Sequence, residues 1–67
     1  GMSIRDLNRA YDWSLPDNEA NTIAGLVIHE AQHIPNVGQV FNFYGFRFEI
    51  LTKEKNKITK IKLAKII

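Results

Sequence analysis

The fold of this chain is decided by residues Thr22–Phe48, TIAGLVIHEAQHIPNVGQVFNFYGFRF. In the first half of this stretch, apolar residues recur at steps of three and four, which predicts an amphipathic helix that runs to about Gln32. The Ile34-Pro35 pair ends that helix, because the residue before a proline avoids helical backbone angles. A short turn follows around Gly38. In the second half, apolar and polar residues alternate on both sides of Tyr44-Gly45, which predicts a β-hairpin with its tight turn there.

The predicted helix begins between Asp17 and Thr22, and the carboxylates of Asp17 and Glu19 suit the positive end of its dipole. At about 100° per residue, one face of the helix is apolar and should cover the core; it consists of Ala20, Ile23, Ala24, Val27, Ala31 and Ile34. Gly25 lies mid-helix, where glycine costs about 1 kcal/mol relative to alanine. We therefore expect another backbone to approach the helix closely at Gly25.

A further helix is predicted before this unit. Ser3-Ile-Arg-Asp6 has the Ser-x-x-acid form of a helix start, in which the hydroxyl accepts a hydrogen bond from a free backbone N–H. Apolar residues recur at three- and four-residue steps, namely Ile4, Leu7, Ala10 and Tyr11. We expect this helix to stop near Asp12 and the side chain of Trp13 to lie in the core.

After the hairpin, Glu54–Lys57 has the composition of a second turn, with Asn56 as the expected left-handed residue. A last strand should point Ile61 and Leu63 inward and the lysines between and beside them outward. The predicted fold class is therefore α+β, with two helices packed on an antiparallel three-stranded meander in the order α-α-β-β-β.

Sixty-seven residues make one small domain, so residues 1–67 are expected to form a single unit. The chain has no cysteine, which excludes disulfides and thiolate metal sites. No apolar run reaches the roughly 18–20 residues that a membrane-spanning helix needs. We interpret Gly1-Met2 as a cloning remnant. Because a helix signal follows almost at once, we expect the chain to be a fragment of a longer protein.

Charge is unevenly distributed along the chain. Residues 1–34 carry two arginines and five carboxylates, a net charge of −3, whereas residues 35–67 carry seven cationic and two acidic side chains, a net charge of +5. An acidic helical half and a basic strand half can attract each other within one molecule or between two copies.

Four segments, TIAGLV, IPNVG, YGFRFEIL and ITKIKL, resemble the CorC/HlyC transporter-associated domain in their order and spacing, and LNRAYDWSLPDNEA resembles the lead-in of that family. The resemblance covers about Ile4 to Leu63. It implies a cytoplasmic accessory module at the C-terminus of a membrane protein, after a transmembrane domain and a pair of CBS domains. Such proteins are associated with magnesium and cobalt efflux, and some are labelled hemolysin-like.

The resemblance also implies a fold similar to part of a PCMH-type FAD-binding domain, without an established flavin or other cofactor. It implies no catalytic residues, and a regulatory role through contacts with the other domains of the parent protein. Family members usually begin with a strand that ends in Asp-Gly, and that strand is missing here. One sheet edge should therefore be open, and we expect a homodimer.

His29-Glu30-Ala-Gln-His33 matches the zinc-peptidase helix motif, in which two histidines four residues apart hold the metal and the glutamate activates water. This pattern supports an alternative function as a metal-binding or metallopeptidase-like module. A third protein ligand would be needed, and Glu49 or Glu54 can only be nominated for it. By the helical angles, both histidines lie opposite the apolar face, so we favour two exposed histidines and no metal site.

The lysine-rich segment Lys53–Lys65 supports a second alternative, a small nucleic-acid-binding domain in which Phe41, Phe43 and Tyr44 would stack on bases. However, the lysines alternate with Ile58, Ile61 and Leu63, as the solvated face of a strand does. We therefore expect no nucleic-acid partner and no direct membrane insertion of this segment. The phenylalanines at period two are expected to be core residues.

Overall fold

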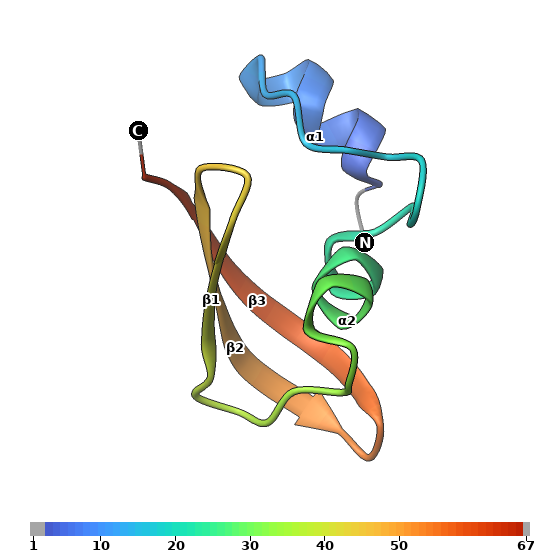
Figure 1. Ribbon diagram of the computed structural model, residues 1–67, viewed down its shortest axis with the longest axis vertical. Helices are drawn as coiled ribbons and strands as arrows, with labels where there is room; N and C mark the ends of the chain where they lie inside the picture. The colour runs from blue at the N-terminus through green and yellow to red at the C-terminus, as the bar shows by residue number, and fades with distance from the viewer. Residues whose placement is uncertain (1–2, 67) are drawn as a thin grey trace.

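The structure is a computed structural model, and it describes residues 3–66. Gly1-Met2, predicted to be a cloning remnant, and Ile67 lie outside the described residues. The elements are α1 (Ile4–Tyr11), α2 (Ile23–Ala31), β1 (Val40–Phe43), β2 (Phe46–Glu54) and β3 (Lys57–Lys65). The three strands form one antiparallel sheet in the order β1-β2-β3, and α2 lies against the sheet while α1 lies beyond α2, toward one end of the molecule (Figure 1). The predicted α+β class and element order are confirmed.

Helix α1 begins and ends where the sequence predicts. The Ser3 hydroxyl accepts a hydrogen bond from the Asp6 N–H at 3.1 Å, which satisfies one of the free donors of the first turn. Asp12 adopts the left-handed conformation, with φ 57°, and ends the helix.

Helix α2 is capped by Thr22, whose hydroxyl accepts a hydrogen bond from the Gly25 N–H at 3.1 Å. The expectation that Asp17 and Glu19 lie in the first turn is wrong, because the helix begins only at Ile23. Asp17 instead forms an ion pair with Arg5, with Nε and Oδ2 3.2 Å apart. This ion pair therefore links the segment before α2 to helix α1.

The buried face of α2 differs from the predicted one. Leu26 and Val27 are both buried, although adjacent helical residues point about 100° apart. The predicted face omits Leu26, because it assumes that only one side of the helix is covered. In the structure, Ile4 and Leu15 belong to the same core cluster and supply a second covering layer. Ile34 is 39% exposed, because the left-handed Gln32 (φ 64°) has already ended the helix.

The first hairpin turn is confirmed. Phe43 pairs with Phe46 across a two-residue turn in which Tyr44 has φ 56° and Gly45 has φ 80°. In the second turn the left-handed residue is Lys55, with φ 55°, and the prediction of Asn56 is wrong. Lys55 holds the first position of this two-residue turn and Asn56 the second. Both favoured types of such a turn require a positive φ at the first position, but only one of them requires it at the second.

The register between β2 and β3 contains an irregularity that the sequence pattern did not predict. Phe48 pairs with Leu63 and Ile50 with Ile61, but the register shifts on both sides of Thr52. The shift brings Ile58 into the core, although it lies three residues rather than two before Ile61.

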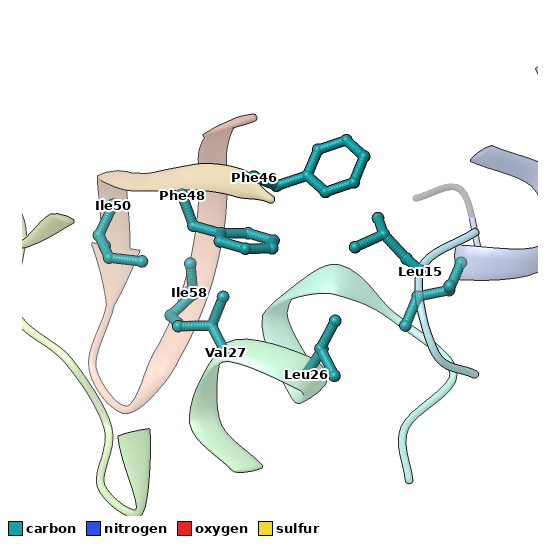
Figure 2. Packing of buried hydrophobic residues seen from close by; sticks show 8 residues of the cluster. Leu15, Leu26, Val27, Phe46, Phe48, Ile50 and Ile58 are labelled. Atoms are coloured by element: carbon teal, nitrogen blue, oxygen red, sulfur yellow. The ribbon is translucent and has the colours of Figure 1, made fainter. Parts of the chain in front are cut away.

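The core lies between the sheet and the two helices, and Figure 2 shows its side chains converging from both layers. It consists of Ile4, Leu15, Leu26, Val27, Phe46, Phe48, Ile50 and Ile58. Trp13 was expected in the core but is only partly buried, because its ring lies over the outside of the cluster. That ring stacks on Tyr11 and meets Phe46 edge-on, each with centroids 4.8 Å apart. Phe41 and Phe43 are likewise half-buried against the core.

Candidate functional site

The two histidines of the sequence motif are both exposed, and they have different neighbours. His29 lies in the last turn of α2, with Nε2 3.7 Å from Glu19 Oε2 and 3.9 Å from Glu30 Oε2. His33 lies beyond the left-handed Gln32, and its Nδ1 is 2.8 Å from the Ala31 carbonyl oxygen. Because the helix ends between them, the pair does not share a continuous helical face as the zinc-peptidase motif requires.

The geometry around these histidines does not complete a metal centre. Within residues 3–66, no three histidine or carboxylate side chains lie close enough together to hold a metal ion. Of the nominated third ligands, Glu49 forms an ion pair with Arg47 at 3.1 Å on β2. Glu54 lies at the far end of the same strand. Glu30, the carboxylate of the motif, instead contacts Tyr44 of the β1–β2 turn.

Glu30, Glu19 and Tyr44 form a polar cluster that sequence reasoning missed. A hydrogen bond from the Tyr44 side chain to Glu30 raises the pKa of Tyr44 above its usual value, and desolvation and the negative charges of Glu30 and Glu19 act in the same direction. The cluster joins α2, the segment before it and the β1–β2 turn. Its signal in the sequence is weak, because the three residues are far apart along the chain.

The lysines of β2 and β3 face solvent. In the described part of the chain, no lysine has a carboxylate oxygen within 4 Å of its Nζ, since every ion pair there involves arginine or histidine. Among the lysines of the described residues, only Lys53 donates a side-chain hydrogen bond, to the Pro35 carbonyl oxygen at 3.1 Å. The half-buried rings of Phe41 and Phe43 stack on each other, 5.9 Å apart, against the core. Rings and lysines therefore do not form one shared stacking surface for bases.

A groove runs along the free side of β3, between that strand and the two helices. Its volume is about 760 Å³. Its apolar lining comes from both layers and consists of Leu7, Ile23, Ala24, Ile58, Ile61 and Leu63. Lys60 borders the groove on the strand side.

Several apolar side chains of β1, of the loop before it and of β2 are exposed. Val37 is 56% exposed and Val40 is 42% exposed, and Ile34 and Leu51 are similarly open. Gly38 donates a hydrogen bond to the Ile50 carbonyl oxygen, which holds the loop before β1 beside β2. The alternation pattern in the sequence did not indicate the exposure of these apolar side chains.

The comparisons with known proteins all point in one direction. Residues 1–66 match the family model described as transporter associated domain, CorC_HlyC. The chain is 33% identical over 58 residues to the magnesium and cobalt efflux protein CorC of Buchnera aphidicola, covering 87% of this chain and 20% of that protein. It is 28% identical over 61 residues to the inner membrane protein YfjD of Escherichia coli, covering 91% of this chain and 14% of that protein.

A solved structure is also similar over almost the whole chain. It is the crystal structure of a functionally unknown conserved protein from Haemophilus influenzae, with a TM-score of 0.89 and 31% identity, covering 97% of this chain and 80% of that one. The chain thus spans a fifth or less of the curated relatives and most of this solved domain. Across residues 3–66, no helix has the length and apolar character to cross a membrane.

Proposed function

The chain belongs to the CorC_HlyC transporter associated domain family, and on that premise we propose that it is a non-catalytic accessory domain of a membrane ion-efflux protein. The observation that carries this proposal is the family match over nearly the whole chain, together with relatives named as an efflux protein and an inner membrane protein. In this proposal the chain is a C-terminal piece of a longer protein and lies on the cytoplasmic side of the membrane. The transported ion is magnesium or cobalt, as in the name of the relative.

The domain acts through contacts with other domains of the parent protein. Its buried side chains are apolar and are used for packing, with no buried polar or charged residue in the described part. The side chains that are available for a function are therefore those at the surface. Packing against a neighbouring domain in only one state of the transporter shifts the equilibrium toward that state by the difference in contact free energy. The partners are the membrane domain and the CBS pair of the parent protein.

Self-association belongs to the same proposal. Val40 of β1 is 42% exposed, and β1 has only β2 as a sheet neighbour among residues 3–66. A two-fold dimer through the hairpin Val40–Ile50 would cover Val40 and pair the open edge. The final strand is the less suitable edge for self-pairing, because it would bring lysines of both copies together.

The complete gene and the membrane topology of its product test this proposal. The expected gene encodes about four hydrophobic spans upstream of these residues. In inverted membrane vesicles, a protease added outside should reach this domain, and in right-side-out vesicles it should not. A short gene that encodes only this domain, or protection in inverted vesicles, would contradict the proposed location.

A further inference from the structure

Strand β1 lies at one edge of the sheet, and the hydrogen bonds identify the backbone groups that point away from β2. The Ile50 N–H donates to the Gln39 carbonyl oxygen, so that carbonyl group faces β2. Residues two apart in a strand direct their backbone groups to the same side, so those of Phe41 face β2 as well. The N–H and C=O groups of Val40 and Asn42 therefore point outward, where no other strand of the described chain pairs with them.

This outward-facing run is short, because the backbone leaves the regular strand on both sides of it. Before it, Gly38 has φ 92°, and its N–H donates to the Ile50 carbonyl oxygen and so points toward β2. After it, Tyr44 has φ 56° and begins the hairpin turn. Within the part of the chain that the structure describes, this edge thus offers the free groups of two regular strand residues, Val40 and Asn42.

No charged side chain guards this edge. Residues 34–44 contain no Asp, Glu, Lys or Arg, whereas edge strands of natural proteins commonly carry a charge that prevents pairing with another chain. Val40 is 42% exposed on the outer face of the sheet, and Phe41 is half-buried on the face toward the helices. A second copy of this strand therefore meets the edge without any like charges that would oppose the pairing.

We propose that β1 pairs antiparallel with β1 of a second copy, about a two-fold axis at Phe41. In this register, Val40 of each copy exchanges two backbone hydrogen bonds with Asn42 of the other, and the two three-stranded sheets become one. Within each copy, Phe41 pairs with Phe48, and Phe48 pairs with Leu63. The two Phe41 rings lie opposite each other, so these apolar rows join across the dimer. The inference rests on the self-association proposed above and names its register.

The alternative registers use fewer backbone groups. Outward-facing residues pair only with outward-facing residues, which allows two-fold axes at Val40, Phe41 or Asn42. An axis at Val40 places Asn42 opposite Gly38, whose N–H is already bonded to β2. An axis at Asn42 places Val40 opposite Tyr44, which has the left-handed conformation of the turn. Each alternative keeps one hydrogen-bonded residue pair, whereas the axis at Phe41 makes two.

Single-cysteine variants report the register, because the chain has no cysteine of its own. In Phe41→Cys the two thiols lie on directly opposite residues, with Cα atoms about 4.5 Å apart, which suits a disulfide. In Val40→Cys and Asn42→Cys the equivalent Cα atoms are about 8 Å apart, which is too far. We expect Phe41→Cys to form disulfide-linked dimers at least about tenfold faster than either, after correction for the reactivity of each thiol. Leu51→Cys, exposed on the central strand, measures the rate of random collision.

The unmodified chain supplies an independent measurement, which decides the register if Phe41→Cys fails to fold. Hydrogen exchange of the Val40 and Asn42 amides should slow by about tenfold or more as protein concentration rises through the range in which the dimer forms, because these N–H groups gain acceptors. The amide of Lys55, an exposed residue of the β2–β3 turn, is the control and should exchange at a constant rate.

Three results would overturn the register: fastest cross-linking at Val40→Cys or Asn42→Cys, equal rates for Phe41→Cys and Leu51→Cys, or Val40 and Asn42 amides whose exchange is independent of concentration. Sedimentation equilibrium of the same samples separates the register from self-association itself. A dimer together with any of these results leaves self-association standing, and a clean monomer overturns both. The measurements need no membrane, so their failure leaves the efflux-protein proposal standing.

Discussion

Asn8 and Leu15 are joined by two hydrogen bonds between one side chain and one backbone. Asn8 Nδ2 donates to the Leu15 carbonyl oxygen at 2.9 Å, and the Leu15 N–H donates to Asn8 Oδ1 at 3.0 Å. These bonds fasten the segment after α1 back onto that helix. They hold the Leu15 side chain, which is 3% exposed, in the core over the second side of α2.

Replacing Asn8 by alanine should therefore lower the free energy of unfolding by about 1–3 kcal/mol, because a part-buried N–H and C=O lose their partner together. Urea denaturation measures the change. Asn18→Ala, at an exposed position of the following segment, is the control and should stay within about 0.5 kcal/mol of the parent chain. Equal stability of the two variants would show that the double hydrogen bond contributes nothing.

Gly25→Leu should be among the most damaging substitutions in α2, although leucine is the better helix former. A Cβ at Gly25 would lie 3.2 Å from Ala20 Cβ and 3.2 Å from Thr22 Oγ1, so the close neighbours are side chains of the preceding segment and not another backbone as the sequence suggested. The larger side chain should cost about 1–3 kcal/mol.

Gly25→Ala should be milder, because its gain in helix propensity of about 1 kcal/mol offsets a partly displaced Thr22 cap. Thermal or urea unfolding of both variants tests this comparison. An increase of about 1 kcal/mol for the leucine variant, as propensity alone would give, would refute the close-contact explanation.

Removal of divalent metal should leave the fold unchanged. His29 and His33 are separated by the end of α2, and the core that holds the helices to the sheet is apolar. Thermal melts with and without EDTA should therefore coincide. A drop of many degrees with EDTA would instead reveal a structural metal ion.

The chain should self-associate in low salt at tens of micromolar. Its β1 edge is open and apolar, and its acidic and basic halves attract each other until salt screens them. Sedimentation equilibrium at two salt concentrations measures the dimer. Val40→Glu should give a monomer, whereas Tyr11→Ser, which removes another exposed apolar side chain, should not. A clean monomer of the unmodified chain in low salt would contradict the dimer.

The local elements could be predicted because their signals are short-range. The Tyr44-Gly45 turn follows from a glycine between two alternating segments, and the Ser3 cap follows from a single tetrapeptide. The second covered side of α2 could not be predicted, because the burial of Leu26 depends on where the Asn8–Leu15 bonds place the preceding segment. Helical angles within α2 carry no information about that segment.

The same limit applies to the candidate sites. The spacing of His29 and His33 is visible in the sequence, but the left-handed Gln32 that separates them is not. The groove along β3 is lined by residues of α1, α2 and β3, so no single sequence motif predicts it. Family resemblance supplied the functional prediction, since membership depends on the order of common residues rather than on one reactive group.

The central claim, that this domain acts through contacts on a membrane ion-efflux protein, is tested most directly by cobalt efflux from vesicles that contain the longer protein proposed above. Three forms are compared: the unmodified protein, one without residues 3–66, and one with His29→Ala and His33→Ala. The contact account predicts that removal of the domain changes the efflux rate by about fivefold or more, as coupling of about 1 kcal/mol gives, while the double-histidine variant transports like the unmodified protein. An unchanged rate without the domain, or the full effect from the two histidine substitutions alone, would contradict it.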